Sequence, residues 1–227
     1  MNDSSPYLGN RLARRGTDRR GFLCGAGALA AGLLLPLPAR AEGIHQLRGD
    51  VRVNGQRIDN SAKIKAGDHV VTTATGFVVF AIGRDAFMLR ERSELRLDAN
   101  AGNPLLIDGL RLLTGALGAV FGKRAIGGAR IIAPTVTAGI RGTGVYLETR
   151  GEGTYFCTCY GTVALAANAN ERDRETVTTT RHNNPRLILN TPRDGQLFVP
   201  AAFETHTDAE MDMLEKCVDR RAPWIAK

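Results

Sequence analysis

The sequence predicts a mainly β protein, a β-roll or sandwich or a solenoid-like stack of strands, with one short helix near the C-terminus. Two observations carry this prediction. Short apolar or alternating runs recur between turn signals over residues 44–165, as they do in sandwiches, rolls and solenoids. The stretch 207–218 has the apolar spacing of a helix.

The first predicted strands follow from turns and apolar runs. Asn54-Gly55 stands between two alternating stretches over residues 50–58, which is the strongest short signal for a hairpin. Turns are predicted at residues 66–68 and 83–85, because Gly and Asp favour turn conformations. Further strands are therefore expected at 69–73, 77–82, 87–89 and 94–97.

The glycine-rich stretch 105–132 is compatible with strands or a short helix, and strands are favoured. The glycines at positions 109, 115, 118 and 122 each weaken a helix by about 1 kcal/mol. The preferred interpretation places strands on both sides of a turn at Thr114-Gly115. Residues 123–130 are expected to form an exposed loop.

The clearest strand is predicted at residues 154–165. Alternate residues of a strand face opposite sides, so one face is expected to carry Tyr155, Cys157, Cys159, Gly161, Val163 and Leu165. The polar stretch 166–174 is expected to be a loop. Strands at 176–180 and 186–189 follow it.

The predicted helix starts with a capping box, Thr207-Asp208-Ala209-Glu210, whose acidic residues suit the positive end of the helix dipole. Met211, Leu214 and Val218 then fall on one face at spacings of three and four. Pro223 is expected to end the helix.

Residues 1–41 have the three parts of an export signal. The pair Arg19-Arg20, followed by Phe22-Leu23, resembles the twin-arginine motif. An apolar run over 22–37 leads to Ala39 and Ala41, the small residues that a signal peptidase accepts, so cleavage is expected before Glu42. The general export route and an uncut membrane anchor are the alternatives. We expect a periplasmic protein without a transmembrane segment after processing.

Charge gives no support to nucleic-acid binding. The chain has 30 basic and 23 acidic residues, of which residues 1–41 hold 6 and 2. The remaining residues therefore carry 24 against 21, a net charge of +3. The basic character of the whole chain is largely a feature of the export signal.

A succession of short motifs resembles the FecR domain, a family named for the periplasmic regulator of ferric-citrate signalling. The motifs are Gly49-Asp50-Val51, residues 66–72, Leu113-Thr114-Gly115-Ala116, residues 133–137, residues 139–145 and Tyr160-Gly161-Thr162-Val163. They span about residues 48–166. The resemblance implies an all-β, non-catalytic periplasmic domain.

Regulators of this family combine a cytoplasmic segment with a transmembrane helix, whereas a cleavable signal stands in their place here. The expected organisation is therefore a signal at 1–41, a FecR-like β domain at 42–175 and a C-terminal extension at 176–227 whose helix packs on the β domain. The expected function is non-enzymatic binding of an unidentified periplasmic protein or small ligand, with a regulatory role.

Arg141, in Arg141-Gly142-Thr143, is a candidate ligand-binding residue because a guanidinium binds carboxylates well. The alternative is structural. The glycines at 139, 142 and 144 would allow a tight bend, and Arg141 would pair with a nearby acid.

A second hypothesis is a metal site formed by Cys157, Cys159, His182 and His206. The spacing of two residues on a strand puts both sulfurs on one face. Two thiolates with one or two imidazoles suit zinc, iron or copper. The alternatives are two ordinary core cysteines, or a disulfide within the pair or to Cys217, with His182 a surface turn residue and His206 a residue that simply leads into the capped helix.

Enzymatic function is not predicted, and no catalytic residues are assigned. The chain has no Gly-x-Ser-x-Gly elbow and no phosphate-binding loop. A thiol hydrolase using Cys157 or Cys159 is disfavoured, because both cysteines lie in the middle of a predicted strand and not at a helix N-terminus. His45 and His69 are interpreted as structural.

Overall fold

The computed structural model describes residues 42–100, 107–123 and 128–225. The predicted export signal, with Arg19, Arg20, Ala39 and Ala41, lies outside the described residues.

The described residues form sixteen strands and one helix. In chain order the strands are β1 (Gly43–Arg48), β2 (Val51–Val53), β3 (Gln56–Arg57), β4 (His69–Thr72), β5 (Phe77–Ile82), β6 (Asp85–Leu89), β7 (Glu94–Ala99), β8 (Ile107–Thr114), β9 (Ala116–Val120), β10 (Ala129–Ile132), β11 (Val136–Ile140), β12 (Gly144–Arg150), β13 (Gly153–Ala167), β14 (Asn170–Thr179), β15 (Arg186–Arg193) and β16 (Gln196–Pro200). The helix α1 spans Asp208–Lys216. The predicted mainly β fold with a short C-terminal helix is confirmed.

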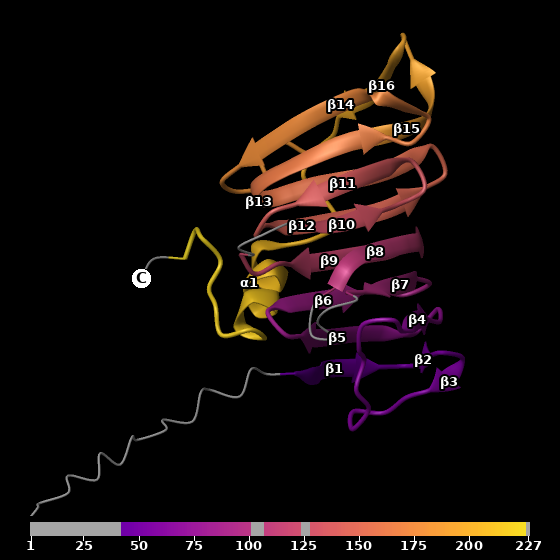
Figure 1. Cartoon of the computed structure of the whole chain (residues 1–227), viewed down its shortest axis with the longest axis vertical. Helices are drawn as coiled ribbons and strands as arrows, with labels where there is room; N and C mark the ends of the chain where they lie inside the picture. Colours follow the sequence, from indigo (N-terminus) through magenta and orange to yellow (C-terminus); the bar gives the residue numbers. More distant parts are fainter. Residues whose placement is uncertain (1–41, 101–106, 124–127, 226–227) are drawn as a thin grey trace, which may run out of the picture. The chain divides into compact units, whose positions relative to one another are not determined.

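The strands make one hydrogen-bonded network that folds into two layers (Figure 1). Layer 1 contains β1, β5, β6, β9, β12, the first half of β13, β15 and β16. Layer 2 contains β2, β3, β4, β7, β8, β10, β11, the second half of β13 and β14. β8 and β10 pair in parallel, so the sheet is mixed. This arrangement is that of a β-sandwich or roll.

Two predicted turns form where their residues require them. Asn54 and Gly55 join β2 to β3 with φ of 52° and 83°, the left-handed values that a two-residue hairpin turn needs. Gly115 joins β8 to β9 at a φ of 84°, and a Cβ there would lie 2.1 Å from Ser93 Oγ. Only glycine fits that position.

β13 crosses from layer 1 to layer 2 at Gly161. The crossing overturns the prediction that residues 155–165 present a single alternating face. Tyr155, Cys157 and Cys159 pack beneath α1, whereas Val163 and Leu165 pack between the two layers. Gly161 has a φ of 89°, and this left-handed residue reverses the alternation of side chains along the strand.

Two hydrophobic clusters result. The inter-sheet cluster fills the space between the layers and includes Val78, Phe80, Phe87, Leu95, Leu110, Leu117, Ile131, Val145, Phe156 and Val163. The helix-side cluster lies on the other face of layer 1, under α1 and the C-terminal segment. It includes Met88, Tyr146, Tyr155, Cys157, Cys159, Met211, Leu214 and Cys217.

Three predictions about loops and boundaries also differ from the structure. The end of the expected loop 123–130 is strand, because Ala129 and Arg130 belong to β10, and residues 124–127 lie outside the described residues. The expected loop 166–174 is largely the hairpin of β13 and β14. β14 is an edge strand, and edge strands carry charged residues to discourage further pairing. The charged composition of residues 170–174 is therefore typical of a loop as well as of this strand. The predicted boundary at residues 175–176 falls inside β14.

The capping box of α1 forms as predicted. Thr207 accepts a hydrogen bond from Glu210 N, and the Glu210 side chain accepts one from Thr207 N. The helix ends at Lys216, well before Pro223. It ends there because Asp219 takes a φ of 56° and Arg220 N donates to Glu215 O at 2.9 Å, the geometry of a helix C-terminus. No helix in the described residues has the length and apolar character needed to cross a membrane.

Candidate metal centre

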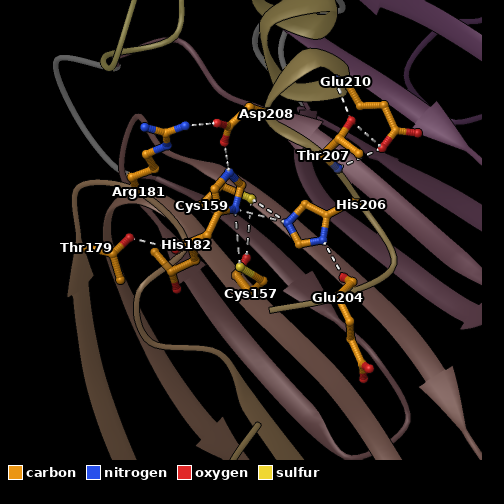
Figure 2. A network of polar contacts seen from close by, with 11 residues as sticks. Cys157, Cys159, Thr179, Arg181, His182, Glu204, His206, Thr207, Asp208 and Glu210 are labelled. Carbon is orange, nitrogen blue, oxygen red and sulfur yellow. Dashed lines mark hydrogen bonds and ion pairs between the residues drawn. The ribbon is translucent and has the colours of Figure 1, made fainter. Parts of the chain in front are cut away.

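Three separate segments bring the four predicted ligands together beside the N-terminus of α1 (Figure 2). Cys157 and Cys159 project from the first half of β13 on the face that α1 covers. His182 lies in the turn between β14 and β15, and His206 lies just before α1. All four side chains are buried.

The donor atoms surround one point. The distance from Cys157 Sγ to His182 Nδ1 is 3.6 Å, and that from Cys159 Sγ to His206 Nε2 is 3.4 Å. The two histidine nitrogens are 3.1 Å apart. One donor atom from each residue lies within 4.8 Å of every other. The sequence prediction that these four residues lie close enough to hold a metal ion therefore agrees with the structure.

These distances agree with the edges of a small tetrahedron. Zinc bonds of about 2.3 Å to sulfur and about 2.05 Å to nitrogen imply edges of about 3.6 Å between S and N and about 3.3 Å between two N atoms. The observed S–N distances are 3.6 and 3.4 Å, and the N–N distance is 3.1 Å. A single ion at the centre would reach all four donors with little movement.

The outer nitrogen of each imidazole faces an acceptor. His206 Nδ1 lies 2.9 Å from the carbonyl oxygen of Glu204, which can only accept, so Nδ1 carries the proton. His182 Nε2 lies 3.0 Å from Asp208 Oδ1. A carboxylate or carbonyl behind a ligating histidine fixes its tautomer and increases its basicity. His206 Nε2 therefore presents a lone pair to the centre. His182 Nδ1 does the same when its proton is on Nε2, which is in ion-pair contact with Asp208 Oδ1 without hydrogen-bond geometry.

Backbone geometry holds both histidines in place. His182 N donates to Cys159 O at 2.9 Å, which ties the histidine turn to the cysteine strand. His182 itself has a φ of 45°, and Thr205, next to His206, has a φ of 65°. Left-handed backbone is uncommon for residues other than glycine, and such strain concentrates at functional sites.

The two thiols differ in acidity. Hydrogen bonding from Cys159, together with contacts to His182 and His206, lowers the pKa of Cys157 to about 4. Burial raises the pKa of the Cys159 thiol well above its ordinary value, and the neighbouring Cys157 raises it further. Cys157 is therefore the more acidic thiol of the pair. A bound cation would favour the thiolate form of both.

Aromatic side chains enclose the centre. Tyr146 stacks on His206, with ring centroids 4.3 Å apart and planes 10° apart. Phe203 stacks on His182 at 4.3 Å, and Trp224 lies 5.0 Å from the same ring. Phe203 is 46% exposed, so it forms the outer cover of the centre. These rings exclude water, which strengthens electrostatic interactions inside.

The arrangement has the chemistry of a closed, mononuclear site. Around one ion, the four protein donors would complete a tetrahedron and leave no position for substrate, whereas catalytic zinc sites keep one position open. Cys217 belongs to the helix-side cluster but not to the four, and burial raises its pKa to about 11. All three cysteines of the described residues are free thiols.

The other candidate residues lie elsewhere. Arg141 is exposed after β11 and borders a shallow groove over β10, β11, β13 and β14, away from the four donors. His69 Nε2 lies 2.8 Å from Glu94. Sequence reasoning missed the role of Asp208, which it read only as a capping acid, and the aromatic covers Tyr146 and Phe203. The position of Asp208 two residues after His206 was the only available signal.

Comparisons of this chain with family models, curated proteins and solved structures found no match.

Proposed function

We propose that this protein is a non-enzymatic metal-binding β domain in which Cys157, Cys159, His182 and His206 hold one zinc ion. One observation carries the proposal. The inner nitrogens of the two histidines face each other at 3.1 Å, while their outer nitrogens face acceptors. Two lone pairs at that separation repel unless a proton or a metal cation lies between them, and the two cysteine sulfurs that complete the set of four donors favour a metal.

Zinc is favoured over the two other candidates, iron and copper. Two thiolates and two imidazoles in a tetrahedron are a common structural zinc set. A mixed-ligand two-iron cluster would place the cysteines and the histidines on different irons, whereas each sulfur here lies 3.4 or 3.6 Å from a histidine nitrogen. Blue-copper sites use a single thiolate with a weak axial ligand.

The role that suits this centre is structural. The ion would tie β13 to the turn that follows β14 and to the segment that precedes α1. The second and third of these are irregular segments, which hydrogen bonds such as His182 N to Cys159 O and Arg90 Nη2 to Thr205 O already tie to the sheet, and the ion would add a stronger link. The ion would hold α1 and its flanking residues over layer 1.

The setting we propose for this centre is the periplasm. Support comes from the signal-like pattern of residues 1–41 and the FecR-like motifs over about residues 48–166. Twin-arginine export moves folded proteins, often with a cofactor already inserted, so zinc bound in the cytoplasm would protect both thiols from oxidation outside. The FecR resemblance supports a binding role toward a periplasmic protein or small ligand.

Metal analysis of the full chain purified from the periplasm tests the proposal. About one zinc per chain is expected for the wild type, and little for Cys157→Ser or His206→Ala, because four ligands must converge. Cys217→Ser is the matched control, since it removes a buried thiol of the same cluster that is not a ligand. Sub-stoichiometric metal in the wild type, or equal metal in Cys157→Ser, would contradict the proposal. Iron or copper in place of zinc would correct the identity of the ion.

A further inference from the structure

A pocket of about 290 Å³ lies at one end of layer 1, separate from the metal centre. Its wall includes Arg84, Phe121, Lys123, Tyr160, Glu215 and Arg220. None of the four metal ligands contributes to it. The residues come from the β5–β6 turn, the segment after β9, the bend of β13 and the segment around the end of α1.

The pocket gathers positive charge. Arg84, Lys123, Arg220 and Arg221 all border it, and Glu215 is its one acidic wall residue. Glu215 is already engaged, because it accepts hydrogen bonds from Tyr160 Oη and Arg220 Nε. The side chains of Arg84, Lys123 and Arg221 make no hydrogen bond or ion pair within the described ranges. Three exposed cations therefore border the pocket with no ion-pair partner among the described residues.

The guanidinium of Arg220 is held by two hydrogen bonds, and one of its nitrogens has no hydrogen-bond partner. Its Nε donates to Glu215, and its Nη1 donates to the Arg84 carbonyl oxygen at 2.6 Å. Its Nη2 is buried and has no hydrogen-bond partner. A buried donor without a partner is costly. An acceptor supplied by a ligand would remove that cost.

Two glycines allow the cations to converge. A Cβ on Gly122 would lie 2.7 Å from Arg84 Cβ and 3.3 Å from Arg220 Nη1. Gly142 has a φ of +60°, and a Cβ there would lie 2.9 Å from Lys123 Cγ. Larger residues at either position would push these side chains apart. Gly142, which was predicted to allow a tight bend after Arg141, thus also makes room for the Lys123 side chain.

We propose that this pocket binds a small oxyanion with at least two negative charges, such as a phosphate or a dicarboxylate. Converging cations without counter-charges repel one another and attract anionic ligands. Guanidinium groups pair well with both carboxylate and phosphate oxygens. Phe121 and Pro223 give the pocket apolar surface beside the cations, which suits a short carbon chain. No ligand of the metal centre lines the pocket, although Glu215 and Arg220 belong to α1 and the segment after it, which the ion would hold in place.

Calorimetric titration of the full chain with inorganic phosphate and, separately, with succinate tests the proposal. Saturable binding of at least one anion is expected. Lys123→Gln and Arg84→Gln should each weaken it by about fivefold, because the lost charge–anion contact is worth about 1 kcal/mol. Preference for phosphate or succinate distinguishes the two sources of the oxyanion.

Arg172→Gln is the matched control, since Arg172 is an exposed arginine on β14 outside the pocket wall. It should bind as the wild type does. Absence of saturable binding of both anions would overturn the proposal. So would equal weakening in Arg172→Gln and Lys123→Gln, which would show non-specific attraction to net charge. Metal content measured on every variant keeps failure of the pocket distinguishable from failure of the metal centre.

Discussion

The inter-sheet cluster and the helix-side cluster share layer 1 but differ in chemistry. Every buried member of the inter-sheet cluster is Val, Ile, Leu, Phe or Ala. The helix-side cluster contains three tyrosines and all three described cysteines among its buried members. The apolar side chains of one face are therefore all hydrocarbon, with Thr154 and Thr158 as buried polar neighbours of Phe156, while those of the other face include groups that donate, accept or ligate.

The difference follows from what covers each face. The inter-sheet face meets another sheet, whose regular spacing favours interdigitating aliphatic side chains. The helix-side face meets one short helix and irregular segments, which bring polar groups with them. Buried polar groups need partners, and here the partners meet around one point. The first cluster is thus expected to set global stability, and the second to hold a local structure that depends on metal.

The largest expected effect comes from the inter-sheet cluster. Phe87 is fully buried, with ring centroids 5.2 Å from Phe80 and 5.9 Å from Phe121. Phe87→Ala should lower the free energy of unfolding by about 3–5 kcal/mol, through lost burial and the cavity that remains. Urea denaturation measures the loss. Metal content of the folded variant should stay at the wild-type value, and a parallel loss of metal would show that the two clusters are not independent.

Metal removal should act on the other face. Stripping zinc with a chelator is expected to lower the free energy of unfolding by about 2.7 kcal/mol relative to protein in zinc at about 100 times its Kd. Hydrogen exchange should increase in residues 181–185 and 201–217 and remain slow in β5 and β6, because only the first two segments depend on the ion. Cys157→Ser should show no further response to chelator. A uniform increase in exchange would contradict the local role.

Asp208 tests the helix-side cluster more finely, because it contacts the ligand His182 without being one of the four ligands itself. Its Oδ1 lies 3.0 Å from His182 Nε2, and its Oδ2 pairs with Arg181. Asp208→Asn should weaken zinc binding by about 10- to 100-fold, as measured by competition with a chromogenic chelator. Asp219→Asn makes the same chemical change at an exposed residue after the helix and should bind zinc normally. Equal affinities in the two variants would contradict a positioning role for Asp208.

Much of the fold could be predicted because its signals are local. Asn54-Gly55, the apolar run 77–82 and the capping box each depend on a few neighbouring residues, and all three formed as expected. The crossing of β13 at Gly161 could not be predicted, because it depends on which sheet each half meets. The end of β14 was predicted as the strand 176–180, whereas its first part was predicted as a loop because its charged residues are typical of loops as well as of edge strands.

The candidate site divides in the same way. The spacing of Cys157 and Cys159 on a strand was enough to place both sulfurs on one side. The short distance between His182 and His206 could not be derived from the sequence, since 24 residues and two strands separate them. The stacking of Tyr146 and Phe203 on the two histidines could not be predicted, because no sequence pattern indicates that an aromatic ring stacks on a histidine. Chemistry was thus predictable where one element supplies it, and not where three segments must meet.

The smallest expected effect distinguishes the start of α1 from the centre beside it. Thr207→Ala removes the side chain that caps Glu210 N and should lower the free energy of unfolding by about 1 kcal/mol. Thr176→Ala, at an exposed position of β14, is the matched control and should change it less. Zinc affinity should fall less than in Asp208→Asn, because His206 is fixed by the Glu204 carbonyl and by Tyr146 and not by the cap. If Thr207→Ala weakened zinc binding as strongly as Asp208→Asn, the helix cap would be shown to position the histidines, and the metal centre would not be independent of the start of α1.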